Sequence, residues 1–97
     1  MSSSLLDNER RCYICGTTLN LHRHHIYPGA FRTKSEQYGC WVYLCFDHHV
    51  GNHGIHTTPE GQANAKQLKA ICQQEFERIH GHDKFMKIFK RNYKEEQ

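Results

Sequence analysis

Two pairs of residues, C-x-x-C and C-x-x-H, have the types and spacing of a zinc site. Cys12 and Cys15 form the first pair, and Cys45 and His48 form the second. Two thiolates on one turn can hold the same ion, and a Cys3His set is a known tetrahedral structural zinc type. A redox role for the first pair is less favoured, because no thioredoxin-like βαβ pattern surrounds it. Cys40 is an alternative ligand, although Cys45 has the better spacing to His48.

Seven histidines between positions 22 and 56 exceed what that zinc site needs. His24 and His25 lie in an extended stretch, where neighbouring side chains point to opposite faces. A bend at the strand end would let His24 bind a metal while His25 faces a substrate. His49 is followed by His53 at helical spacing and by His56, and intervening glycines weaken a regular helix. His53 and His56 are therefore both candidates for a further metal ligand. A simpler interpretation is that this histidine-rich segment is a nonspecific metal-binding loop.

The elements that must position these groups can be read from local patterns. Residues 19–27 and 41–44 are expected to be strands. Thr58, followed by proline and glutamate, is a helix start; Gly81 ends that helix, and Asp83 can cap the next. Two apolar stripes at helical spacing indicate the faces that pack in the core: Leu68, Ile71, Cys72, Phe76 and Ile79, then Phe85, Met86, Ile88, Phe89 and Tyr93.

Length and composition indicate a single small domain. The chain has 97 residues, 37% of them hydrophobic, and no apolar run approaches the ~20 residues of a membrane span. An odd count of 5 Cys without a secretory pattern favours reduced thiols that bind metal over disulfides. The net charge of +3 permits nucleic-acid binding. We expect a disordered lead-in at 1–9, the chemical groups at 10–57 and a helical segment at 58–97.

The order of these motifs resembles the HNH nucleases. The resemblance is carried by the C-x-x-C pair, by His-His-Ile-x-Pro-Gly at 24–29 and by Val-Tyr-Leu-Cys-x-x-His-His at 42–49. It covers residues 12–56, about half of the chain, and is closest to small phage-type HNH proteins. The family implies an α+β fold: a ββα-metal core with a structural zinc knuckle, here followed by a C-terminal helical segment.

The resemblance also implies roles for individual residues. His24 would bind the catalytic metal, and His25 would be the general base that activates water. His49 would bind the same metal, with His53 or His56 as a further ligand. The nearest cations for flanking phosphates are Arg23, Arg32 and Lys34.

The expected function is that of a metal-dependent DNA endonuclease. Its cofactors would be a structural zinc and a catalytic divalent ion such as Mg, Mn, Ni or Zn. Its partners would be DNA and possible recombination or phage packaging proteins, with no membrane, in the cytoplasm of a bacterial or phage-infected cell. The alternative is a zinc-stabilised nucleic-acid-binding module with a degenerate nuclease site. Two distinct ions, one with open coordination positions, would favour the enzyme.

Overall fold

A two-stranded antiparallel sheet forms the centre of a small α+β fold. The computed structural model describes residues 3–96. Strand β1 (Leu21–His25) pairs with β2 (Trp41–Cys45), so that Leu21 lies opposite Cys45 and His25 lies opposite Trp41. β1 falls within the predicted stretch 19–27, and β2 extends one residue beyond the predicted stretch 41–44. A 3-10 turn, η1 (Gly29–Phe31), and a short helix, α1 (Arg32–Gln37), connect them.

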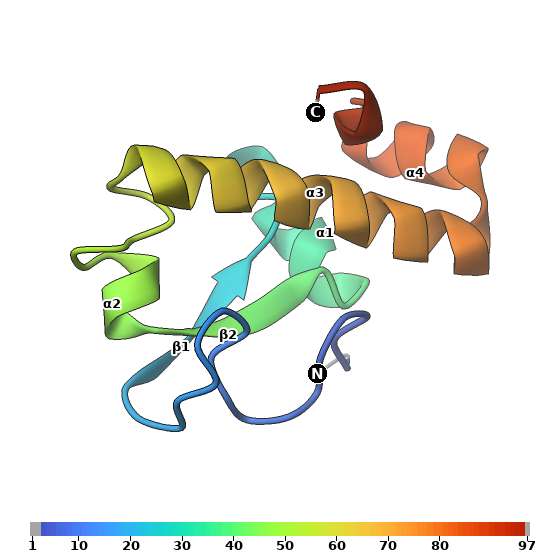
Figure 1. Ribbon diagram of the computed structural model, residues 1–97. Helices are drawn as coiled ribbons and strands as arrows, with labels where there is room; N and C mark the ends of the chain where they lie inside the picture. The colour runs from blue at the N-terminus through green and yellow to red at the C-terminus, as the bar shows by residue number, and fades with distance from the viewer. Residues whose placement is uncertain (1–2, 97) are drawn as a thin grey trace.

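Helices follow the sheet along the rest of the chain. A single-turn helix comes directly after β2, and a long helix then crosses above the two strands to reach the last two elements (Figure 1). These elements are α2 (Phe46–His49), α3 (Pro59–His80), α4 (His82–Phe89) and the 3-10 turn η2 (Tyr93–Glu96). None of the helices in residues 3–96 is both long and apolar enough to span a membrane.

The ends of α3 follow from its local sequence. Thr58 is the N-cap, and its hydroxyl accepts a hydrogen bond from the Gly61 N–H at 2.9 Å. At the other end Gly81 has a φ of 90°, which a residue with a side chain rarely adopts. Both boundaries were predicted. The predicted cap at Asp83 is wrong: Gly81 occupies the N-cap of α4 without a side-chain hydrogen bond, and Asp83 lies inside the first turn.

Aromatic side chains join the sheet to the helices. Tyr27, just after β1, lies with its ring centroid 4.5 Å from that of Phe89, and its hydroxyl donates a hydrogen bond to the Lys69 carbonyl at 2.6 Å. Of the first predicted stripe, the buried members are Leu68, Cys72 and Phe76. Ile71 and Ile79 are 42% and 48% exposed, so the prediction that they pack in the core is wrong. In the second stripe Phe85, Phe89 and Tyr93 are buried, and Met86 and Ile88 are partly buried against them.

The expected disordered lead-in is wrong for residues 3–9. Ser4 is buried, and its hydroxyl donates a hydrogen bond to the Trp41 carbonyl at 2.5 Å. The Leu5 N–H donates to the Gly39 carbonyl at 2.8 Å, and its side chain packs on the core. This segment therefore adds apolar contacts beside β2 that local sequence patterns do not reveal. Met1 and Ser2 lie outside the described residues.

Candidate metal centres

The two C-x-x pairs converge as one cluster, here called the Cys3His cluster (Cys12, Cys15, Cys45 and His48). The sulfur atoms of Cys15 and Cys45 are 3.9 Å apart, and His48 Nδ1 lies 3.9 Å from Cys12 Sγ and 3.3 Å from Cys45 Sγ. A tetrahedral zinc with Zn–S bonds of about 2.3 Å spaces its sulfur ligands by roughly 3.8 Å. The cluster therefore has the dimensions of a closed four-ligand zinc site.

Two short local structures hold these ligands in place. In the first pair's turn the Gly16 N–H donates to the Cys12 carbonyl at 2.8 Å, and Gly16 has a φ of 81°. Cys45 ends β2, and α2 begins at the next residue, so one helical turn brings His48 beside it. The predicted pairing is thus present. Cys40 lies elsewhere as a buried residue and is not a member of the cluster.

The close packing of the thiols favours a bound cation. Burial tends to raise the pKa of Cys12. Hydrogen bonds from the backbone N–H groups of Cys15, Cys45 and Ile14 have the larger, opposite effect, so the pKa lies below its ordinary value. Burial and the neighbouring thiols raise the pKa of Cys45. Several thiolates this close repel one another unless a cation lies between them, and a bound metal supplies that charge.

Three of the remaining histidines form a second group, the three-histidine cluster (His24, His49 and His56). One ring nitrogen from each lies within 4.8 Å of the others. His24 is buried, whereas His56 is exposed. Three ligands with one side open to solvent correspond to the arrangement of catalytic metal sites, in which water or substrate completes the coordination.

The structure decides between the two alternatives for the third ligand. His53 turns away from the cluster, and its Nδ1 lies 2.9 Å from Asp47 Oδ2. His56 reaches the cluster because the loop after α2 folds back onto the start of α3. A Cβ added to Gly61 would lie 1.8 Å from the carbonyl oxygen of Gly54, so the loop can approach the helix this closely only because Gly61 has no side chain.

The electrostatics of the three-histidine cluster favour neutral ligands. Burial, followed by the charges of His56 and His49, lowers the pKa of His24 to about 3. Burial, followed by His56 and then His22, lowers the pKa of His49 to about 4. These imidazoles are therefore neutral near pH 7, which is the form that binds a metal.

His22 lies directly beside the three-histidine cluster, although the sequence did not lead us to assign it to the site. Its Nδ1 lies 3.0 Å from the Nδ1 of His49. If His49 binds a metal through Nε2, its Nδ1–H can donate to His22, which then fixes the ring and its tautomer. The signal was available in the sequence, since His22 and His24 are two residues apart on a strand and must share a face.

Replacing His22 should weaken the second metal site and leave the first intact. We expect His22→Ala to reduce affinity for the ion in the three-histidine cluster roughly 10–100-fold, the usual effect of losing such a partner. His22→Asn, which keeps an acceptor near the position of Nδ1, should lose less. Competitive cobalt titration measures both variants. Parent affinity in His22→Ala would show that His49 needs no such support.

His25 lies on the other face of β1, together with Arg23. Its Nε2 is 3.0 Å from Glu36 Oε1, and Arg23 contacts both oxygens of the same carboxylate, at 3.0 and 2.8 Å. The Arg23 guanidinium also stacks 3.8 Å from the centroid of the Trp41 ring. Arg23 is thus held by protein groups. The structure does not bring His25 into the three-histidine cluster.

The other two predicted cations lie on α1 and are exposed. Arg32 Nε lies 3.4 Å from His25 Nδ1. Lys34 faces α4 across a surface cleft that Lys84, Lys87 and Lys90 also line. These positive side chains come from separate elements, so their grouping depends on the tertiary structure.

Comparisons with family models, with curated proteins and with solved structures give no match for this chain. What the protein does must therefore be inferred from the geometry of the two clusters. One has four ligands and closed dimensions, and the other has three ligands and an open side.

Proposed function

We propose that this protein is a metal-dependent endonuclease that hydrolyses phosphodiester bonds in DNA. The observation that supports this most is the pair of dissimilar clusters in one small domain. A module that only binds nucleic acid needs the closed Cys3His cluster for stability, but it has no use for a second, open set of imidazoles. The zinc-stabilised binding module remains the second candidate.

The arrangement around the open cluster also agrees with the proposed ββα-metal core. His24 comes from β1, His49 comes from α2, and β2 pairs with β1 and leads directly into α2. His56 follows in the next loop. This order of strand, strand and helix around a divalent ion is what the HNH resemblance implies. This order of elements supports the proposed HNH family on structural grounds alone.

The ion would supply electrostatic stabilisation. Cleavage of a phosphodiester builds negative charge on the phosphoryl and leaving oxygens, and a divalent ion held by His24, His49 and His56 offsets that charge. Imidazole ligands suit Zn, Ni, Co or Mn in the test tube better than Mg. Ligand nitrogens within 4.8 Å of one another need only small ring rotations to reach one ion.

His25 is proposed to accept the proton of the attacking water. Hydrogen bonds from His25 and Arg23 outweigh burial and lower the pKa of Glu36, so this carboxylate is ionised and accepts from His25 Nε2–H. The lone pair for a proton is then on Nδ1, which accepts a hydrogen bond from the exposed Arg32 Nε–H at 3.4 Å. Arg32 must turn away before Nδ1 can take a proton from water. His25 is the last residue of β1, whose outer edge pairs with no other described strand. A phosphodiester across that edge can meet His25 from one face and the ion from the other.

The lysines of α4 and of the residues that follow it should add DNA affinity without sequence preference. Lys87 and Lys90 are exposed, whereas Lys94 is ion-paired with Glu77. Each phosphate that a lysine neutralises contributes about 0.9 to the slope of log K against log salt on duplex DNA. Reversing both charges, with Lys87→Glu and Lys90→Glu, should therefore weaken binding and flatten its salt dependence. Fluorescence anisotropy at several salt concentrations measures the affinity and its salt dependence. An unchanged slope would show that these lysines do not contact phosphates and only face solvent.

A nicking assay on supercoiled plasmid tests the proposed function. The protein is incubated with Mg, Mn, Co, Ni or Zn in turn, beside the His25→Ala variant as the matched control. We expect conversion of supercoiled to nicked and linear plasmid with at least one of the imidazole-binding metals. If no ion supports cleavage while the protein still binds DNA, the binding module is the better description.

A further inference from the structure

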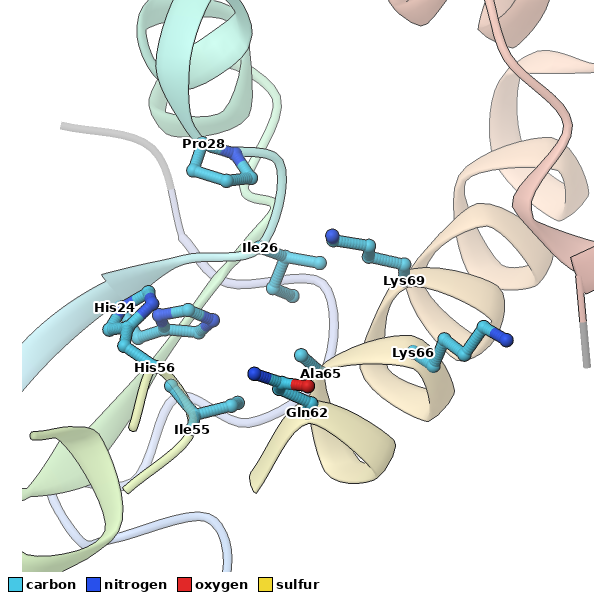
Figure 2. Close-up of a pocket in the computed structure, with 9 residues that line it drawn as sticks. All are labelled: His24, Ile26, Pro28, Ile55, His56, Gln62, Ala65, Lys66 and Lys69. Carbon is cyan, nitrogen blue, oxygen red and sulfur yellow. The ribbon is translucent and has the colours of Figure 1, made fainter. Parts of the chain in front are cut away.

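A cleft joins the three-histidine cluster to one face of α3. His24 and His56 form one side, and residues of α3 form the other (Figure 2). The cleft has a volume of about 270 Å³; Ile26 and Ile55 line it beside the histidines, and Ala65 lines it from α3. The HNH resemblance covers residues 12–56, so it gives α3 no role in this site.

The polar groups on the α3 side come from a single helix face. Gln62, Lys66 and Lys69 follow at intervals of four and three residues, which places them on one side of a helix. Figure 2 shows Gln62 and Lys69 extending across the cleft from α3, with the two histidines on the far side. The Tyr27 hydroxyl bonded to the Lys69 carbonyl holds this turn of the helix against the chain leaving β1.

The charges that line the cleft are not balanced by acidic groups. Among the described residues, neither Lys66 nor Lys69 has a carboxylate within ion-pair distance, and no aspartate or glutamate lines the cleft. Ion binding at the three-histidine cluster adds further positive charge on the other side. Like charges that face each other over an apolar floor repel, and an anion between them removes that repulsion.

We propose that this cleft binds one phosphate group of a nucleic-acid strand, with Lys69 contacting its nonbridging oxygens and Gln62 donating a hydrogen bond from its amide. Lys66, whose ammonium points away from the histidines in Figure 2, adds positive charge at the edge of the cleft. The identity of the anion rests on the proposed endonuclease function. The phosphate would lie between α3 and the ion, so α3 is a wall of the site and not only a support for the sheet. Binding in the cleft can be tested separately from cleavage.

The experiment measures the binding of a fluorescein-labelled 20-base-pair DNA duplex by anisotropy at several salt concentrations. Structural zinc is retained and no further divalent metal is added, so that cleavage does not interfere. For Lys66→Gln with Lys69→Gln we expect the salt slope to fall by about 0.9 and affinity to drop roughly tenfold near 0.1 M salt, because one phosphate contact is lost. Arg78→Gln is the matched control: this exposed cation on α3 is paired with Glu75 and lies outside the cleft.

A second variant separates charge from packing, since the Lys69 ammonium also lies 5.8 Å from the centroid of the Tyr93 ring. Lys69→Arg keeps the cation and should keep the parent slope. A parent slope in the double glutamine variant would overturn the proposal, and so would a loss in Lys69→Arg as large as that in Lys69→Gln. If the salt slope falls as expected but no metal supports plasmid nicking, phosphate binding in the cleft is supported and the proposed endonuclease function is contradicted.

Discussion

Replacing Cys15 with alanine should leave the domain unfolded or severely destabilised. Structural zinc in small Cys/His sites has an apparent binding free energy of about 10–16 kcal/mol near neutral pH. That is as large as the whole free energy of unfolding of a typical domain, about 5–15 kcal/mol. Here the ion would tie the turn after Cys12 to the junction of β2 and α2, which also positions His49.

Circular dichroism, thermal melting and metal analysis of the purified variant measure this effect. Ile14→Ala is the matched control, because Ile14 lies in the same turn, is 37% exposed and does not belong to the cluster. It should keep both its zinc and its melting temperature near the parent values. A well-folded Cys15→Ala protein with an undiminished zinc content would show that the assignment of the Cys3His cluster is wrong.

His24→Ala and His25→Ala should both lose cleavage, but in different ways. His24 is one of three ligands, so its removal should mainly weaken binding of the catalytic ion, and excess metal should restore part of the activity. His25 does not belong to the cluster, so its removal should leave the ion in place. The rate should then fall roughly 10²–10⁴-fold, the usual contribution of general base catalysis, and more metal should not restore it.

Single-turnover cleavage with a metal titration distinguishes the two variants. DNA binding by His25→Ala should stay near normal, and both variants should retain the structural zinc because neither residue belongs to the Cys3His cluster. If His25→Ala cleaves at the parent rate, His25 is not the base and the HNH mechanism does not apply. Loss of structural zinc in either variant would indicate a folding defect in place of a catalytic one.

The features of this protein that depend on local chemistry could be predicted from its sequence alone. The Cys3His ligands were predictable because two C-x-x pairs hold their own geometry within one turn each. The ends of α3 were predictable because a capping threonine and a glycine at positive φ act within a few residues. The two strands were found through their composition, and α2 gains its position from the strand that precedes it.

Features that depend on contacts between segments far apart in the sequence were determined only by the tertiary structure. His56 and not His53 joins the three-histidine cluster because the close approach of Gly54 and Gly61 turns the loop back onto α3. His25 lies against Glu36 because α1 packs on the face of β1 opposite to His24. Spacing along the sequence sets which residues share a face of one element, but it does not set which element covers that face.

The cleft and the burial of the N-terminal segment could not be predicted from the sequence for the same reason. Lys69 looks like a solvated helix residue in the sequence, and only the crossing of α3 over the sheet places it opposite His24 (Figure 2). Ser4 carries no signal of burial, yet it is covered because its hydroxyl meets the Trp41 carbonyl. Such contacts join residues far apart in the chain, and their free energy depends on the packed arrangement as a whole.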